Sequence, residues 1–200
     1  MVKEKPASAR DYTDYLCKLF GTAEDGDFRV SRGVTFQITG DCTLRCSYCY
    51  ENHKNCQSMT LETGKKIIDY ILDLYEKDDG NFICKKTKGI VLDFIGGEPL
   101  LQAELIEKIF DYFIAECWRK HIPIAPFSRI SFATNGQLWF TPEAQHLFRK
   151  YHDMMSVTVS IDGVKELHDA FRVDKNGIGS FDTAYRAFQD GKKYGWYNSK

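Results

Sequence analysis

The chain has 200 residues, of which 43% are hydrophobic, and its formal net charge is −1. A chain of this length and composition can form one domain with a buried core. The near-zero charge gives no electrostatic attraction for nucleic acid or for an anionic membrane surface, so neither is expected as a partner.

No stretch of the sequence approaches the ~20 apolar residues that a membrane-spanning helix needs. The chain opens with a charged segment, residues 1–5, and lacks the apolar centre of a secretory signal peptide, which predicts a cytoplasmic location. The seven cysteines of a chain in that compartment are expected to serve metal binding or catalysis in part, rather than to form a disulfide scaffold.

The first predicted element is a short helix, because apolar residues recur at helical spacing between positions 12 and 20 and Gly21 then follows. Residues 28–32 are compatible with a strand that turns back toward the next one. We therefore divide the chain into an N-terminal extension, residues 1–32, and a core, residues 33–200.

Strand and helix patterns alternate four times after this extension. The expected strands cover residues 34–39, 90–95, 129–134 and 155–161. The expected helices lie around residues 67–75, 105–113, from Pro142 onward and 181–188, with Thr60, Thr141 and Ser180 as candidate N-caps. This alternation predicts an α/β fold with a parallel sheet and right-handed crossovers. A barrel-like sheet and a doubly wound sheet both fit the pattern.

Each expected strand ends in residues that packing alone does not require. These ends are the loop with Cys42, Cys46 and Cys49, then Gly96-Gly97-Glu98-Pro99, Thr134-Asn135-Gly136 and Ser160-Ile161-Asp162-Gly163. A parallel sheet brings the carboxyl ends of its strands to one rim, where ligands bind. The sequence therefore predicts one site built from all four strand ends.

The loop offers three thiolates that can converge on one metal centre, which is one ligand short of a closed four-coordinate site. Either a fourth ligand comes from elsewhere, or one metal position stays open for a substrate. Gly96 and Gly97 let a ligand approach their backbone carbonyls closely, and Glu98 adds a carboxylate, so that together they suit a cationic amine. Asn135 and Ser160 offer neutral hydrogen-bonding groups for ribose hydroxyls or a carboxylate.

Simpler interpretations exist for several of these residues. His53 or Cys56 could complete a zinc site with the three thiolates. Asp162-Gly163 is also an ordinary turn sequence. His168 and Asp169 are interpreted as structural or capping groups.

The spacing Cys42-x3-Cys46-x2-Cys49, with Tyr48 before the last cysteine, resembles the signature of the radical S-adenosylmethionine (radical SAM) superfamily. The segment Gly96-Gly97-Glu98-Pro99, at the end of the second expected strand, is similar to the second motif of that family. A structural zinc site does not need this second motif, so the resemblance favours the open metal position.

The residues at the end of the fourth expected strand indicate which subgroup of the superfamily the chain resembles. Ser160-Ile161-Asp162-Gly163, followed by His168-Asp169 and Arg172, is similar to the subgroup of peptide maturases and sulfatase-maturing enzymes. Members of that subgroup usually carry a C-terminal SPASM-type domain with additional clusters. The resemblance covers roughly residues 35–184.

The resemblance implies a role for each site residue. Three irons of a [4Fe-4S] cluster would be held by Cys42, Cys46 and Cys49, and the fourth iron would bind S-adenosylmethionine. In S-adenosylmethionine, the methionine ammonium would be bound by Gly96, Gly97 and Glu98, and the adenine would contact the backbone of Tyr48. The ribose and the carboxylate would be bound by Ser160 and Arg172, and Asn135 is a further candidate for these contacts.

The family fold is a partial TIM-like (β/α) barrel with six strands, of which four β/α units are recognisable here. The chain is therefore expected to be the N-terminal portion of a longer maturase, without the C-terminal units and the auxiliary-cluster domain. Residues 10–32 would either bind a leader peptide or cap the barrel.

The implied function is reductive cleavage of S-adenosylmethionine to a 5′-deoxyadenosyl radical that modifies a peptide or protein. An external one-electron reductant such as a flavodoxin or ferredoxin is implied as a partner. The alternatives are a truncated, non-catalytic relative that binds the cluster, S-adenosylmethionine or a peptide, and a zinc-stabilised binding module.

Overall fold

The computed structural model describes residues 30–51, 57–80 and 82–196. The expected N-terminal helix between positions 12 and 20 lies outside these ranges, as do the candidate zinc ligands His53 and Cys56. Within the described ranges, no helix combines the length and the apolar character needed to cross a lipid bilayer.

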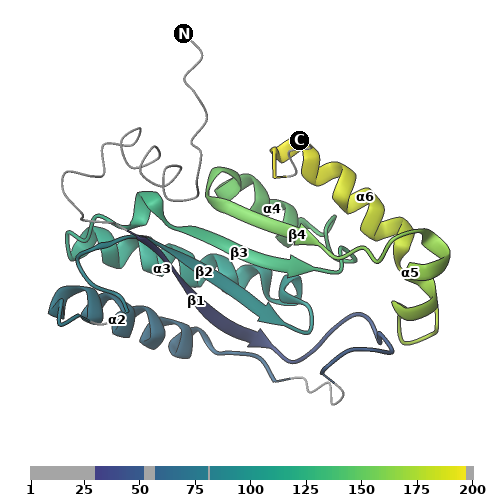
Figure 1. The fold of residues 1–200 in the computed structure, drawn as a ribbon, viewed down its shortest axis with the longest axis horizontal. Helices are drawn as coiled ribbons and strands as arrows, with labels where there is room; N and C mark the ends of the chain where they lie inside the picture. The colour runs from purple at the N-terminus through teal and green to yellow at the C-terminus, as the bar shows by residue number, and fades with distance from the viewer. Residues whose placement is uncertain (1–29, 52–56, 81, 197–200) are drawn as a thin grey trace, which may run out of the picture.

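In the described part of the chain, four parallel strands form one sheet, in the order β1-β2-β3-β4. The strands are β1 (Val30–Thr39), β2 (Thr87–Gly96), β3 (Arg129–Thr134) and β4 (Met155–Val159). Figure 1 shows all four arrowheads at the same end of the sheet. The sequence of the strands along the chain is thus also their order in space, as the predicted alternation requires.

Helices connect the strands. They are α2 (Leu61–Lys77), α3 (Ala103–Arg119), α4 (Pro142–Tyr151), α5 (Lys165–Phe171) and α6 (Phe181–Gly191), with short 3-10 turns η1 (Pro99–Gln102), η2 (Ala125–Phe127), η3 (His152–Met154) and η4 (Lys192–Tyr194). Helix α3 packs against both α2 and α4, and α6 packs on β4. The α/β fold with a parallel sheet is therefore confirmed.

The hydrophobic core lies between the sheet and these helices. Alternate side chains of each strand point into the core, and most of them are buried. Phe36 on β1 and Phe94 on β2 are fully buried, and their ring centroids lie 5.1 Å apart. The apolar stripes of the helices, for example Ile68, Ile71 and Leu72 on α2, cover the same face. Side chains on the opposite face of the sheet are exposed or half-buried, except at the strand ends, where Thr39 and Thr87 are buried.

The structure differs from the expected bounds at the start of the sheet. Residues 30–32 do not turn back but continue into β1, because they already pair in register with β2, Ser31 with Gly89 and Arg32 with Ile90. The expected boundary after residue 32 consequently falls inside a strand. Helix α5 was not expected, since a helix of 7 residues has too few turns to show an apolar repeat.

Two glycines let the end of β2 lie directly against the end of β1. Gly96 has φ of 154°, and a Cβ atom there would lie 2.1 Å from the carbonyl oxygen of Thr39. A Cβ atom on Gly97 would lie 2.1 Å from the carbonyl oxygen of Asp41. The freed space is used by hydrogen bonds, from Gly97 N–H to Thr39 O at 3.0 Å and from Glu98 N–H to Asp41 O at 2.8 Å. The first residues after β1 are therefore fixed by backbone contacts.

A buried histidine holds the segment between β4 and α6. The ring of His168 is fully buried, and its Nδ1 accepts a hydrogen bond from Asp162 N–H at 3.2 Å. Its Nε2 lies 3.0 Å from Ser180 Oγ, which in turn donates to the carbonyl oxygen of Arg172 at 2.8 Å. This chain of bonds requires a neutral ring with its proton on Nε2.

The same contacts revise one expected cap. Ser180 does not cap α6 with its side chain, because its hydroxyl is committed to His168 and Arg172. Asp169 takes that place, since its Oδ1 accepts from Phe181 N–H at 2.9 Å. The interpretation of His168 and Asp169 as structural or capping groups is confirmed.

Gly97→Ala is expected to lower the free energy of unfolding by about 1–3 kcal/mol, because the added methyl group has to displace the backbone at Asp41. Gly33→Ala is the matched control on β1, where no atom lies within 4 Å of the added Cβ, and its stability should be unchanged or slightly raised. Urea unfolding of both variants makes the comparison. Equal stabilities would show that the two strand ends are not packed this tightly.

His168 makes stability depend on pH. Burial lowers the pKa of His168, so the unfolded chain, with its ordinary pKa of about 6.5, binds a proton more readily than the folded chain. The free energy of unfolding should therefore fall as the pH drops from about 7 to about 5. Glu98, whose pKa is raised by burial, is present in parent and variant alike, so the difference between them reports on His168. His168→Gln should show a flatter pH dependence in the same urea titrations. Equal slopes for the variant and the parent would contradict this assignment.

Candidate functional site

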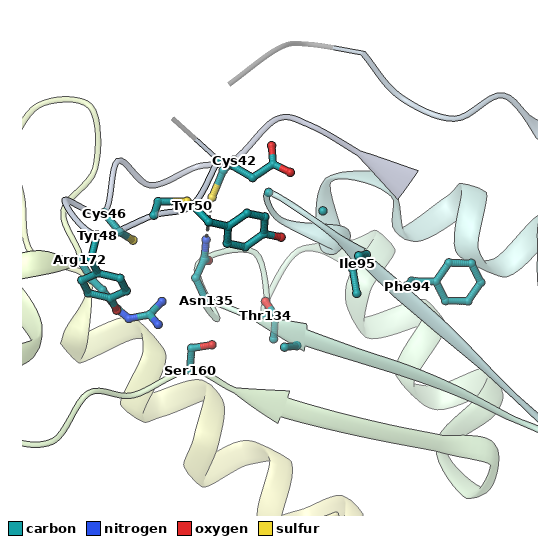
Figure 2. Close-up of a pocket in the computed structure, with 15 residues that line it drawn as sticks. Cys42, Cys46, Tyr48, Tyr50, Phe94, Ile95, Thr134, Asn135, Ser160 and Arg172 are labelled. Carbon is teal, nitrogen blue, oxygen red and sulfur yellow. Dashed lines mark hydrogen bonds between the residues drawn. The ribbon is translucent and has the colours of Figure 1, made fainter. Parts of the chain in front are cut away.

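One cavity opens at the carboxyl ends of the four strands, and it is enclosed by the loop that follows β1 (Figure 2). All three cysteines of the loop line it, together with residues from the ends of β2, β3 and β4 and from the segment after α5. The lining residues are Cys42, Cys46, Tyr48, Cys49, Tyr50, Glu51, Phe94, Ile95, Gly96, Gly97, Ala133, Thr134, Asn135, Ser160 and Arg172. Nine of the ten expected site residues are therefore brought to one cavity, and the exception is Glu98.

The three cysteines are presented on one wall. Cys42 is buried and the other two are half-buried. The loop turns tightly at its end, where Cys49 N–H donates to Cys46 O at 3.1 Å. In the part of the chain that is described, no group of three His, Cys, Asp or Glu residues is placed to bind a single metal ion together. An iron–sulfur cluster does not require the three thiolates to meet at one ion, because each thiolate binds a different iron.

A distant segment holds the cysteine loop from the other side. Arg45 N–H donates to Val173 O at 2.7 Å, and Ser47 N–H donates to Phe171 O at 3.1 Å. Leu44 and Asp174 form an isolated antiparallel bridge in the same place. The loop is thus paired in a strand-like manner with residues more than a hundred positions away, which no local sequence pattern indicates.

Glu98 lies behind the cavity. Its side chain is only 1% exposed, and its carboxylate accepts hydrogen bonds from Thr134 Oγ1 at 2.7 Å, Asn135 N–H at 2.8 Å and Leu100 N–H at 3.1 Å. Burial raises the pKa of Glu98, against the effect of these three donors. The expectation of a carboxylate that faces a bound amine is thus not met. A buried carboxylate needs donors close by, and the end of β3 supplies them.

Asn135 joins the end of β3 to the cysteine loop. Its Nδ2 donates to Thr43 Oγ1 at 3.0 Å and to Cys42 Sγ at 3.6 Å, and the second contact is drawn in Figure 2. Its Oδ1 accepts from Gln137 N–H at 3.0 Å. The side-chain amide is therefore occupied by the protein, although the residue lines the cavity.

Ser160 and Arg172 keep polar groups available. The Ser160 hydroxyl makes no hydrogen bond to any other residue in the described ranges, and Figure 2 shows it across the cavity from Cys42. Arg172 uses only its Nε atom, which donates to Asp162 Oδ2 at 2.8 Å, and its terminal nitrogens bond to no described residue. The Ser160 hydroxyl and the terminal nitrogens of Arg172 are thus available to a ligand, while the Arg172 guanidinium is held in place by its ion pair with Asp162.

Asp162 organises one side of the site. Its Oδ2 accepts from both Arg172 Nε and the Tyr48 hydroxyl, and the Arg172 guanidinium lies 5.5 Å from the centre of the Tyr48 ring. Burial alone would raise the pKa of Asp162, but the bonds from Arg172 and Tyr48 outweigh it and hold the pKa below its usual range. Burial and the bond to Asp162 raise the pKa of Tyr48 to about 12.

Sequence reasoning gave Asp162 no role of its own, because Asp-Gly is a common turn dipeptide. The only signal was its place inside the motif at the fourth strand end, next to Ser160. Tyr48 is more than a hundred positions away from Asp162 in the sequence, and helix α5 separates Asp162 from Arg172. The contacts among the three residues therefore became visible only in the structure.

Known proteins match this chain over most of its length. It is 37% identical to an uncharacterised protein of Methanocaldococcus jannaschii over 72% of this chain and 43% of that protein. It is 28% identical to the antilisterial bacteriocin subtilosin biosynthesis protein AlbA of Bacillus subtilis, over 80% of this chain and 30% of AlbA. It is also 28% identical to a cysteine-type anaerobic sulfatase-maturating enzyme of Clostridium novyi, over 72% of this chain and 35% of that enzyme. The chain thus spans less than half the length of these relatives.

A solved structure has the same fold. Native anSMEcpe with bound AdoMet and the Cp18Cys peptide superposes with a TM-score of 0.63 at 26% identity, over 84% of this chain and 41% of that one. The expected partial TIM-like barrel, and the similarity to peptide maturases and sulfatase-maturing enzymes, are therefore confirmed.

The family model of the radical SAM superfamily matches residues 36–200, from the middle of β1 to the last residue of the sequence. The matched region contains the cysteine loop and all four strand ends that surround the cavity. On this evidence the chain belongs to the radical SAM superfamily.

Proposed function

We propose that this chain, from the start of β1 onward, is the cofactor-binding core of a radical SAM enzyme that modifies a peptide or protein. The observation that carries the proposal is that three cysteines line a cavity whose other walls offer the Ser160 hydroxyl, the terminal nitrogens of Arg172 and glycine backbone. This donor set suits an iron–sulfur cluster next to a zwitterionic nucleoside.

The residues fit the group that the family uses. Cys42, Cys46 and Cys49 would hold three irons of a [4Fe-4S] cluster. When bound, the cluster and S-adenosylmethionine supply a 5′-deoxyadenosyl radical that removes a hydrogen atom from the substrate. The protein contributes binding, orientation and exclusion of water.

Different residues of the chain would bind different parts of S-adenosylmethionine. The terminal nitrogens of Arg172 can bind the methionine carboxylate, and the Ser160 hydroxyl can bind a ribose hydroxyl. The backbone carbonyls of Gly96 and Gly97 can accept from the ammonium group, while the backbone of Tyr48 contacts the adenine. Glu98 and Asn135 then act indirectly, because their side chains fix the positions of β3 and of the cysteine loop.

The relatives support a peptide or protein substrate. One is a bacteriocin biosynthesis protein, another is a sulfatase-maturating enzyme, and the solved neighbour holds a peptide. Since the chain spans only part of each, modification of a polypeptide is proposed for the whole protein that contains this core. A cytoplasmic location and an external one-electron reductant such as a flavodoxin or ferredoxin belong to the same proposal.

Anaerobic reconstitution tests the cluster. The parent chain should bind about four iron and four sulfide per chain, and Cys42→Ala, Cys46→Ala and Cys49→Ala should each lower that content strongly. Cys84→Ser is the matched control, because Cys84 is a half-buried thiol that does not line the cavity. One zinc per chain without iron, in protein purified anaerobically, would contradict the proposal and support a zinc-stabilised module.

Asp162→Asn tests the polar side of the site. The reconstituted variant should keep its cluster but bind S-adenosylmethionine about tenfold more weakly, because a charged partner of Arg172 and Tyr48 is lost. Tyr48→Phe removes one of the two bonds and should have a smaller effect. Equilibrium dialysis with labelled S-adenosylmethionine provides both dissociation constants, and unchanged values for Asp162→Asn would show that the cluster of Asp162, Tyr48 and Arg172 does not organise the ligand.

A further inference from the structure

Among the described residues, no helix covers the other face of the sheet, and this face is mainly polar. Its exposed or half-buried positions, which we call the inner face, are Ser31, Gly33, Thr35 and Gln37 on β1, Val91, Asp93 and Ile95 on β2, Arg129, Ser131 and Ala133 on β3, and Ser156 and Thr158 on β4. The inside of a closed parallel barrel is instead filled by branched apolar side chains. The inner face is therefore built to contact something polar rather than to form a core.

The inner face is continuous with the cofactor cavity. Ile95 and Ala133 belong to both, because they line the cavity and lie on the inner face. In register with them across the sheet are Gln37, which pairs with Ile95, and Thr158, which pairs with Ala133. A molecule bound on this face next to that row would thus reach the cofactor.

One row further from the rim, about 7 Å along the strands, hydroxyl side chains flank a carboxylate. Asp93 pairs in register with Thr35 on one side and with Ser131 on the other, and Ser131 pairs with Ser156. These four residues cross the whole sheet side by side. The row offers hydrogen-bonding groups throughout and a negative charge at one position.

Asp93 is the unusual member of this row. It is half-buried, yet within the described ranges its carboxylate makes no hydrogen bond and no ion pair. Arg129, the cation on the inner face, lies a row further from the rim and forms no ion pair with it. The Asp93 carboxylate is therefore available to a cationic group of a molecule bound on the inner face, with which it would form a charge-assisted hydrogen bond.

On the inner face, where the polypeptide substrate of the proposed function would lie, we propose that Asp93 selects a lysine or arginine side chain close to the residue that is modified. This inference rests on the proposed function, because it assigns the substrate side of the same site. The hydroxyl row binds main-chain amides of the segment without regard to sequence, and Asp93 adds a charge-assisted hydrogen bond that depends on the substrate side chain.

The probes are fluorescent glycine–serine peptides of about ten residues, long enough to cross the four strands, with one central lysine, arginine, norleucine or glutamate. Binding to the reconstituted chain loaded with S-adenosylmethionine is followed anaerobically by fluorescence anisotropy. The lysine and arginine peptides should bind about tenfold more tightly than the norleucine peptide, and the glutamate peptide should bind most weakly.

The variants assign this preference to one carboxylate. Asp93→Asn and Asp93→Ser should reduce the preference to less than about twofold, while Asp93→Glu should retain part of it. Asp153→Asn is the control for net charge, because its side chain is 87% exposed on η3, outside the inner face, and it should bind like the parent. Thermal unfolding of each variant verifies that it is folded.

Three results would overturn the inference: a preference that survives Asp93→Asn and Asp93→Ser, a norleucine or glutamate peptide that binds as well as the basic ones, or dissociation constants above about 1 mM for both basic peptides. Production of 5′-deoxyadenosine by the same preparations distinguishes a failure of the proposed function from a failure of this inference. A chain that binds no cluster contradicts the proposed function. A chain that cleaves S-adenosylmethionine but shows no preference dependent on Asp93 contradicts this inference alone.

Discussion

The site depends on the contact between the backbone at the end of β2 and the backbone of the first residues after β1. Gly97 lies so close to Asp41 that even a methyl group does not fit, and the amides of Gly97 and Glu98 bond to the carbonyls of Thr39 and Asp41. The cysteine loop begins at this contact. Its later residues are held by hydrogen bonds from Arg45 and Ser47 to the segment after α5. The loop is therefore positioned from both sides by the protein itself, as a preorganised ligand set requires.

Two carboxylates next to the cavity, Glu98 and Asp162, have pKa values that their surroundings shift in opposite directions. Glu98 is buried, and its three described hydrogen-bond donors are all neutral, so burial raises its pKa and it serves as a link between β2 and β3. Asp162 is paired with Arg172 and bonded by Tyr48, so its pKa is lowered and its charge is retained. Groups that remain for a ligand in the described cavity include the Ser160 hydroxyl, the terminal nitrogens of Arg172 and the glycine backbone.

The parts of the fold that could be predicted from the sequence are those set by local patterns. Alternation and apolar stripes identified the four strand–helix units, and the caps Thr60 and Thr141 marked helix starts that the structure confirms, because the hydroxyl of each accepts from a backbone amide of the first turn. The strand at residues 129–134 has the predicted bounds. The topology of parallel sheets then placed the unusual strand ends on one rim.

The features that could not be predicted depend on contacts between distant residues. The Glu98 carboxylate points toward donors at the end of β3. The Ser180 hydroxyl bonds to His168 instead of capping α6, and Asp162 gains its role from the bond with Tyr48. The bonds between the cysteine loop and residues 171–174 join segments that share no sequence pattern. Such contacts follow from the assembled fold, so the sequence indicated which residues meet at the site but not which of them face the ligand.

The most direct test of the central claim is the conversion of S-adenosylmethionine to 5′-deoxyadenosine by the anaerobically reconstituted chain after reduction with dithionite. The account predicts that 5′-deoxyadenosine and methionine form in equal amounts, and that none forms when Cys42, Cys46 or Cys49 is replaced. A parent chain that carries its cluster and binds S-adenosylmethionine, yet releases no 5′-deoxyadenosine, would contradict the account and identify a non-catalytic relative.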